Sequence, residues 1–207
     1  MLKKLGVVKS KTKGYQVFNE KICPDFLDNK MKPSEYVNYC WNTFKKTSEY
    51  TNNSINGAVF ELIIASLFIK ENIIPLNFQA KVAFVPNCIY DMLVYCKECG
   101  PIGISAKTSL RERYKQADLE AIALKYVHRK AENYLLTLDK NEAKGVSDKI
   151  KSGDVLGINA VYVANEPEFD DLIEYLKGKE LVTPGKVEIV TATTTITKES
   201  IDRLKSK

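Results

Sequence analysis

The 207-residue sequence contains no hydrophobic run long enough to cross a lipid bilayer. Its longest largely apolar stretch is Leu62–Ile69, whereas a membrane-spanning helix needs roughly 20 residues. The N-terminus is basic, but Leu5–Val8 is too short to be the hydrophobic region of a secretory signal. These absences predict a protein without a membrane segment that is located in the cytoplasm.

Cysteine and histidine are also scarce. The five cysteines form an odd, scattered set, which argues against a disulfide framework and fits a reducing compartment. Cys96 and Cys99 have the spacing of half a zinc knuckle, yet tetrahedral zinc needs four ligands and the sequence has no second pair of this kind. A plain hairpin turn is therefore the favoured interpretation, with structural zinc as the alternative. His128, the one histidine, is expected at a helix surface or core edge.

Internal repeats, low-complexity tracts and a recognisable interdomain linker are absent as well. With 44% hydrophobic residues, the chain is long enough for one domain with a sizeable core. We therefore expect a single domain over residues 1–207.

The net charge of +5 is moderate but unevenly distributed. Residues 1–21 hold six Lys and one Glu, and residues 107–130 hold four Lys and three Arg against three acidic residues. Such local concentrations of cations suit a polyanionic partner. The alternative is that both runs are solvated faces without a ligand.

The pattern of apolar residues, turns and caps predicts an α/β fold with a mixed, largely antiparallel central sheet flanked by helices. Two helices come first, one opened by Pro33 and one running from about Gly57 to Lys70. A capping-box pattern from Ser109 to Glu112 predicts a long helix over about 110–131. The expected strands are 81–85, 91–96, 101–107, 133–138 and 158–164. A helix capped by residues 165–167 should end near residue 176. Residues 191–197 are expected to form a strand or a loop, and residues 198–206 a last helix.

Two groups of apolar residues stand at helical spacing. The long helix has one face formed by Leu119, Ile122, Ala123 and Val127. The aromatic residues of the first helix are assigned to the core, namely Tyr36, Tyr39, Trp41 and Phe44.

Asp91 and Lys107 lie on either side of a predicted hairpin whose turn is Lys97–Pro101. Antiparallel pairing should set Asp91 roughly opposite Ala106 or Lys107. Side chains that neighbour each other across strands lie about 5 Å apart, so one acidic and one basic group could act on the same metal-bound water. The alternative for Lys107 is a solvated lysine at a strand end.

Glu61 interrupts the apolar helix segment 58–65. An isolated buried carboxylate is costly, so such a residue is usually paired, protonated or bound to a metal. A core salt bridge or a thin exposed stripe is the alternative for Glu61 alone. Together with Asp91 and Lys107, it indicates a catalytic arrangement.

The order of these residues resembles the PD-(D/E)xK nuclease superfamily. Glu61 stands on a helix, Asp91 on the second strand and Ser105-Ala106-Lys107 on the third, and a capped helix follows. The run from Lys107 to Gln116, KTSLRERYKQ, is similar in particular to type II restriction endonucleases. The resemblance covers about residues 56–176. It departs from the family pattern at Tyr90, where the family has proline, and at Ser105, which replaces the second acidic residue.

The resemblance implies a restriction-endonuclease-like core with the element order αβββαβ. It also implies magnesium-dependent, sequence-specific cleavage of double-stranded DNA by a homodimer, because two-fold DNA is matched most simply by two-fold protein. The implied catalytic residues are Asp91, Lys107, Glu61 and Ser105. Magnesium would be held by Asp91, Glu61 and the carbonyl oxygen of Ala106.

The helix that follows Lys107 begins with cations and polar residues, which suits a phosphate-binding helix N-terminus or contact with base edges. The implied DNA contacts are Thr108, Ser109, Arg111, Arg113, Lys115 and Gln116. In the alternative, the arginines pair with Glu112, Asp118 or Glu120 on the helix surface. Residues 1–55 and 177–207 would supply further dimer and DNA contacts.

Two other functions stay open at this point. One is a structure-specific, repair or nicking nuclease built on the same core. The other is a catalytically silent DNA-binding protein, which Ser105 makes conceivable. Magnesium-dependent cleavage separates the enzymes from the silent protein.

Overall fold

The computed structural model describes residues 1–8, 10, 12–85, 87–184, 189–191 and 193–206. Its helices are α1 (Lys13–Val17), α2 (Pro33–Lys45), α3 (Asn53–Lys70), α4 (Arg113–Val127), α5 (Lys140–Ser152), α6 (Glu168–Lys177) and α7 (Lys198–Lys205). Its strands are β1 (Leu76–Val82), β2 (Tyr90–Cys96), β3 (Gly100–Ala106), β4 (Glu132–Thr137), β5 (Ala160–Val163), β6 (Ile189–Thr191) and β7 (Thr194–Ile196). A π-helical turn at Phe18–Ile22 and two 3-10 turns, Phe26–Asp28 and Ser48–Thr51, complete the N-terminal third.

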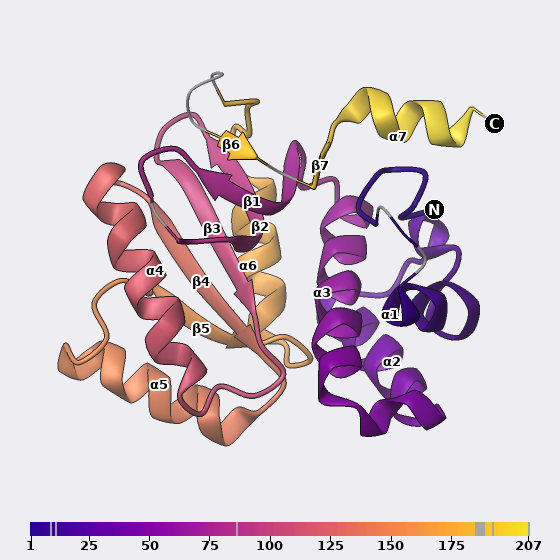
Figure 1. Cartoon of the computed structure of the whole chain (residues 1–207), viewed down its shortest axis with the longest axis horizontal. Helices are drawn as coiled ribbons and strands as arrows, with labels where there is room; N and C mark the ends of the chain where they lie inside the picture. The colour runs from indigo at the N-terminus through magenta and orange to yellow at the C-terminus, as the bar shows by residue number, and fades with distance from the viewer. Residues whose placement is uncertain (9, 11, 86, 185–188, 192, 207) are drawn as a thin grey trace.

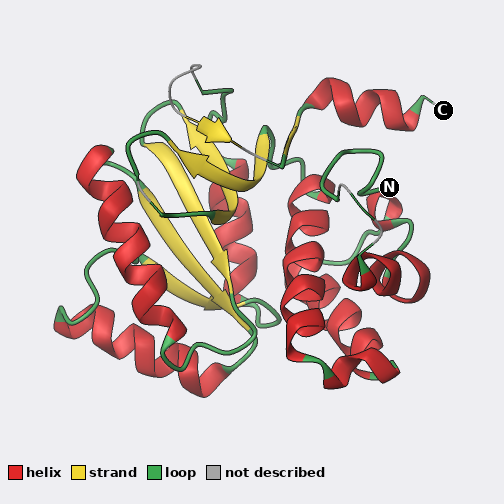
Figure 2. Ribbon diagram, viewed as in Figure 1, coloured by secondary structure: helices red, strands yellow, loops and turns green. Residues whose placement is uncertain are grey.

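The strands form one mixed sheet in the order β5-β4-β3-β2-β1-β6, with β7 also paired to β1 (Figure 2). Strand β2 pairs antiparallel with both β1 and β3. Strands β3, β4 and β5 pair in parallel, with helical crossovers between them. The α/β class with a mixed sheet is thus confirmed, and helix 198–206 and strand formation within 191–197 are confirmed with it.

Helices cover both faces of this sheet (Figure 1). The larger core joins α2, α3 and α6 to one face, where Met92, Ile102 and Ile104 point. Two smaller clusters on the other face join the sheet to α4 and α5. The site described below lies between these two layers.

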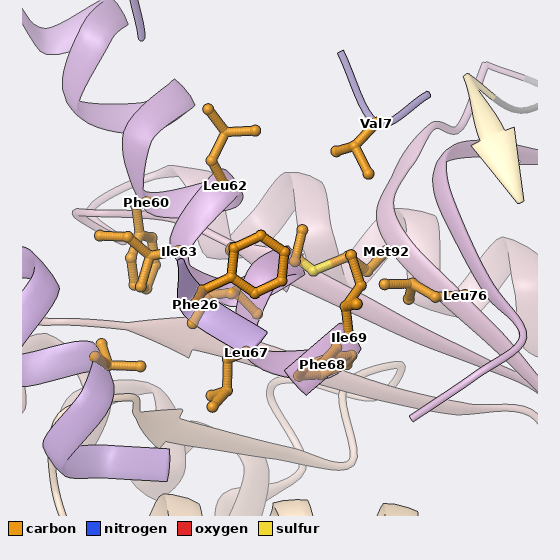
Figure 3. Close-up of a cluster of buried hydrophobic side chains, with 14 of the residues drawn as sticks. Val7, Phe26, Phe60, Leu62, Ile63, Leu67, Phe68, Ile69, Leu76 and Met92 are labelled. Carbon is orange, nitrogen blue, oxygen red and sulfur yellow. The ribbon is translucent and has the colours of Figure 1, made fainter. Parts of the chain in front are cut away.

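Helix α3 forms the centre of the larger core. The Asn52 side chain accepts hydrogen bonds from the backbone N–H groups of Ser54 and Ile55, so the helix begins at Asn53 and not near Gly57. Nearly every side of the helix is apolar, which is typical of a helix surrounded by protein. Figure 3 shows its side chains in one cluster with Phe26 of the N-terminal region and Met92 of β2.

Within the described residues, α3 alone meets the length and hydropathy of a membrane span, and 56% of it is buried inside the fold. The N-terminal residues contribute much of that cover. Leu2, Phe18 and Phe26 are all nearly inaccessible to solvent and belong to the same core cluster. The first 55 residues, expected at the periphery, therefore help to build the core.

Several predicted boundaries were wrong. The strand expected at 81–85 is β1, Leu76–Val82, and Ala83–Val85 lie in the turn that follows. The capping box at Ser109 does not form, because Glu142 of α5 accepts hydrogen bonds from the Ser109 hydroxyl at 3.1 Å and from the Leu110 N–H at 2.5 Å. Helix α4 consequently begins at Arg113, and it ends at Val127.

Of the apolar face predicted for this helix, Ala123 packs against a core cluster, whereas its two largest exposed members point away from the core. Leu119 is 68% exposed, and Val127 is exposed as well. The buried face is made of small residues and one leucine, namely Ala117, Ala121 and Leu124, because the helix backbone lies close to the sheet and to the loop at Gly157. In α2, Tyr39 is exposed and was wrongly assigned to the core, whereas Tyr36, Trp41 and Phe44 are buried as predicted.

Candidate active site

Asp91 and Lys107 meet at the end of the β2–β3 hairpin. The Lys107 Nζ lies 2.7 Å from Oδ2 of Asp91, and the Ala106 backbone N–H donates to the same oxygen at 2.8 Å. The predicted proximity is therefore confirmed. The register is one residue from the expected one, because Met92 pairs with Ile104 and the residue before Met92 then faces Ser105.

Glu61 of α3 belongs to the same cluster of charges. Its side chain is largely buried, and burial raises the pKa of the carboxyl to about 8. The negative charge of Asp91 raises this pKa further, whereas Lys107 and a hydrogen bond from Gln79 lower it. Since both charges act on Glu61, the three ionisable groups share one small region between α3 and the hairpin.

Gln79 of β1 is a member of the site that sequence reasoning missed. The pairs Phe78–Met92 and Ala80–Tyr90 set Gln79 across from Asp91, and its Nε2 donates to Oε2 of Glu61 at 3.0 Å. Its φ of 50° lies in the left-handed region, which costs a non-glycine residue about 1–3 kcal/mol and is concentrated at functional sites. The sequence of β1 alternates apolar residues with Asn77, Gln79 and Lys81, so it offered no signal that separates Gln79 from the other two polar residues.

A pocket of about 470 Å³ opens at these side chains. Glu61, Gln79 and Asp91 line one part of it. Ala58, Leu62 and Phe78 line it from the same helix and strand as Glu61 and Gln79. The remainder comes from residues that are far away in sequence, namely Val7, Val8, Ser10, Thr12 and Thr193. The N-terminal segment and the loop before β7 thus form walls of the site that the motif alone did not predict.

A third carboxyl, that of Glu120, approaches from the opposite layer. Glu120 of α4 is half-buried, and burial raises its pKa, while the charge of Lys107 lowers that pKa and the charge of Asp91 raises it. Gln116 donates to Glu120 Oε1 at 2.8 Å, and the Tyr90 hydroxyl donates to the Glu120 backbone oxygen at 2.8 Å. Gln116, predicted to contact DNA, therefore has an intramolecular partner.

Ser105 lies on β3 two residues before Lys107 and is partly exposed. Over the residues that the structure describes, its hydroxyl makes no hydrogen bond. Ser105 therefore lies near the site, but its hydroxyl is not hydrogen-bonded to the other described residues of the site.

The two carboxyls fit a hard divalent cation. Within the described part of the chain, no three His, Cys, Asp or Glu side chains group together as a complete metal site. Magnesium, however, is commonly bound by one or two carboxylates together with water and substrate phosphate oxygens. Glu61 and Asp91 meet that requirement, and a cation between them would offset the unfavourable proximity of Asp91 that raises the pKa of Glu61.

Some of the residues predicted to contact DNA have side chains that bind other residues of the protein, and others have side chains without such a partner among the described residues. Ser109 binds Glu142, and Lys115 forms an ion pair with Glu112 on the exposed surface of α4. Arg111 and Arg113 are exposed, and within the described residues their side chains have no ion-pair or hydrogen-bond partner. Thr108 is partly exposed in the loop between β3 and α4.

No protein-family model, no curated protein and no solved structure matches this chain. The geometry of the site is therefore the basis for inferring its chemistry. A buried carboxyl with a raised pKa, a second carboxylate and a lysine in contact with it can together bind a cation, orient a water molecule and stabilise negative charge.

Proposed function

We propose that this protein is a magnesium-dependent DNA endonuclease of the restriction type, built on an αβββαβ core formed by α3, β1, β2, β3, α4 and β4. The contact of 2.7 Å between Lys107 Nζ and Asp91 Oδ2, beside the partly buried Glu61, carries the proposal. The consecutive placement of these residues on a helix and two neighbouring strands supports it.

Hydrolysis of a phosphodiester requires an in-line water and neutralisation of the charge that grows on the phosphoryl oxygens. A bound magnesium ion would supply Lewis acidity and lower the pKa of a coordinated water. Asp91 Oδ2 is occupied by Lys107 and Ala106, so Oδ1, which accepts no hydrogen bond from the described residues, is the oxygen available as a ligand. Glu61 would provide the second carboxylate after losing its proton.

Lys107 would act directly on the reacting groups. Its ammonium is held at the edge of the site by Asp91 and remains a quarter exposed, so it can reach a phosphate oxygen or the attacking water. There it would orient the water and stabilise the pentavalent transition state. Help of this kind is typically worth about 10²–10⁴ in rate.

Arg111 and Arg113 would hold the DNA backbone next to this site. They lie just before and at the first residue of α4, where cations and helix N–H groups together favour phosphate. Cleavage of both strands at a symmetric sequence would require two copies of the site, which a homodimer provides.

Incubation of the purified protein with a large phage DNA and magnesium tests the function. Discrete fragments are expected for a site-specific endonuclease. Cleavage that produces no discrete fragments, or nicks alone, would instead indicate a structure-specific, repair or nicking enzyme. Absence of any cleavage by a folded protein would contradict the proposal.

A catalytically silent DNA-binding protein is the second candidate. It is favoured by Ser105, which offers no charge to a metal, and by the closed ion pair between Lys107 and Asp91. Retained DNA binding without cleavage at any magnesium concentration would identify it.

Magnesium titration of the Glu61→Gln variant tests the proposed metal site. The amide keeps the size of the side chain and can still contact Gln79, but it is a weaker ligand. Activity should fall, and raised magnesium should partly restore it. An unchanged titration would mean that Glu61 has only a structural role.

A further inference from the structure

The outer face of α4 carries apolar side chains that no other part of the described chain covers. Leu119 is 68% exposed and Tyr126 is 89% exposed, with the partly buried Ile122 between them. Their spacing of three and four residues sets them in one stripe along the helix. In Figure 1, α4 lies on the outside of the sheet.

The stripe borders a hollow with fixed walls. A hollow of about 460 Å³ is lined by Ile122, Lys125, Tyr126, Arg129 and Leu156. Leu156 itself is 68% exposed, although it lies in a loop that is held firmly against α4.

Asp118 and Gly157 fix that loop. Oδ1 of Asp118 accepts from the Gly157 N–H at 2.6 Å, and a Cβ at Gly157 would lie 2.5 Å from both the Asp118 oxygen and the Ile122 nitrogen of the helix backbone. Only glycine permits the loop to approach the helix backbone so closely. Leu156 is therefore held beside Ile122, and the position of this wall of the hollow is fixed by the fold.

The sequence of the stripe is complementary to itself in the reverse direction. Extended by one charged residue at each end of α4, it reads Glu112, Lys115, Leu119, Ile122, Tyr126 and Arg129. Glu112 is the N-cap residue, and Arg129 lies in the turn after the helix, where it lines the same hollow as Ile122 and Tyr126. Two copies placed antiparallel about an axis between Leu119 and Ile122 bring Leu119 against Ile122. The same axis brings Lys115 against the Tyr126 ring and Glu112 against Arg129.

Each of these pairs is chemically favourable. The central pair is apolar, the next is a cation over an aromatic ring, and the outer pair is ionic, which matches the apolar centre and polar rim of protein interfaces. Within one chain Lys115 pairs with Glu112, and the dimer exchanges this exposed ion pair, which contributes little to stability, for the two contacts with the second copy. A two-fold interface requires this reciprocity, in which one residue contacts a second and the second contacts the first. Arg129 has no ion-pair partner in the described part of its own chain.

We propose that α4 forms a two-fold symmetric homodimer interface, in which Leu119 of one copy fills the hollow beside Ile122 of the second. Helix α4 spans about 22 Å, so the contact is smaller than the roughly 800 Å² per partner of a standard interface. A reversible dimer with a Kd in the roughly micromolar range is therefore expected. Formation of this dimer needs no nuclease activity, although the proposed cleavage of both DNA strands would also use a dimer.

Sedimentation of the full chain at concentrations from about 1 to 100 µM, a range that brackets the expected Kd, tests the interface. The wild type should shift from monomer to dimer, and Leu119→Asp should remain monomeric with an unchanged melting temperature at low concentration. Tyr39→Asp is the matched control, because Tyr39 is an exposed apolar residue on α2, and it should dimerise like the wild type. A monomeric wild type, or a dimer that Leu119→Asp leaves intact, would overturn the proposal.

Charge exchange tests the antiparallel register. Glu112→Arg alone places two arginines in each outer pair, and Arg129→Glu alone places two glutamates there, so each single variant should dimerise at least several-fold more weakly. An equal mixture of the two should form heterodimers, and the double variant should form homodimers again. If the mixture and the double variant stay as weak as the single variants, the register is wrong. If only DNA affinity changes and the mass does not, the face binds DNA and the dimer is excluded.

Discussion

Helices α3 and α4 pack on opposite faces of the same sheet, and they use their apolar residues in opposite ways. In α3, all residues from Leu62 to Ile69 are buried, because the sheet covers one side and the N-terminal helices cover the other. In α4, the sheet side holds small residues, while Leu119 and Tyr126 face outward. The apolar residues of α3 are thus buried within the chain. In our proposal, the outward apolar residues of α4 are buried by a second copy of the protein.

The two helices also supply one carboxyl each to the surroundings of Lys107. Glu61 is the more deeply buried, and its pKa rises to about 8, whereas burial raises the pKa of the half-buried Glu120 less strongly. Lys107 lies between the layers and lowers both pKa values. The site therefore lies where the α3 layer and the α4 layer meet. Substitutions in the two layers should have distinguishable effects.

The largest effect is expected where the two layers meet. Lys107→Ala should reduce cleavage by about 10²–10⁴-fold while folding and DNA binding are largely retained. Asp91→Ala should reduce cleavage at least as strongly, because it removes the partner of Lys107 and, in our proposal, a magnesium ligand. The assay is the rate of plasmid cleavage under single-turnover conditions.

Lys97→Ala is the control for this pair, since Lys97 belongs to an exposed ion pair with Glu180 at the opposite end of the hairpin. It should cleave at the wild-type rate. Wild-type rates in Lys107→Ala or Asp91→Ala would remove both residues from the catalytic assignment.

Truncation of one apolar residue in each helix sharpens the contrast in burial. Phe60→Ala should destabilise the fold by about 3–5 kcal/mol, because the ring is fully buried and packs edge-on against Trp41. Leu119→Ala should change the free energy of unfolding of the monomer by no more than about 0.5 kcal/mol. Urea unfolding at low protein concentration measures both. Equal losses would mean that Leu119 is packed within the monomer.

The pH dependence of stability separates the two carboxyls. In metal-free protein, the pKa of Glu61 is about 8 when folded, above its ordinary value of 4.5, so its stabilising contribution is fully present below pH 4.5 and is lost as the pH rises through 8. Glu61→Gln should therefore gain stability over the wild type as the pH rises from about 5 to 9. Glu120→Gln should gain in the same direction but less.

Thermal melts in chelator across this pH range provide the measurement. A wild type and a Glu61→Gln variant with parallel pH profiles would show that burial does not raise the pKa of Glu61. A larger gain of stability for Glu120→Gln than for Glu61→Gln would mean that the pKa of Glu120 is raised more than that of Glu61.

The smallest effect is expected from the cations at the start of α4. If Arg111 and Arg113 contact phosphates alone, each Ala variant should weaken specific and non-specific DNA binding alike and lower the salt slope by about one unit. If one of them contacts a guanine edge, discrimination should fall by roughly 1–3 kcal/mol at one base position. Lys115→Ala should have less effect, since Lys115 already pairs with Glu112.

Competition binding with cognate and scrambled duplexes across a salt series distinguishes these cases. Unchanged binding in all three variants would mean that the run is a solvated helix face.

Much of the site could be predicted from local sequence. The hairpin turn between β2 and β3 brings Asp91 and Lys107 together, because pairing across a short turn is a local constraint. Glu61 was recognisable because a carboxyl inside an apolar helix needs compensation. Gln79 and Glu120 were not recognisable, since their relation to the site depends on the register of β1 with β2 and on how α4 crosses the sheet.

The sequence alone determined the α/β class, the order of the central elements and the meeting of Asp91 with Lys107, because turn chemistry, caps and hydrophobic periodicity act over short distances. Only the tertiary structure decided where α4 begins, since Glu142 from α5 takes the groups of Ser109 and Leu110 that a capping box would use. It also decided which face of α4 is buried, because the loop at Gly157 approaches the helix backbone so closely that larger side chains must point outward. Such contacts join residues far apart in the chain, and no local pattern encodes them.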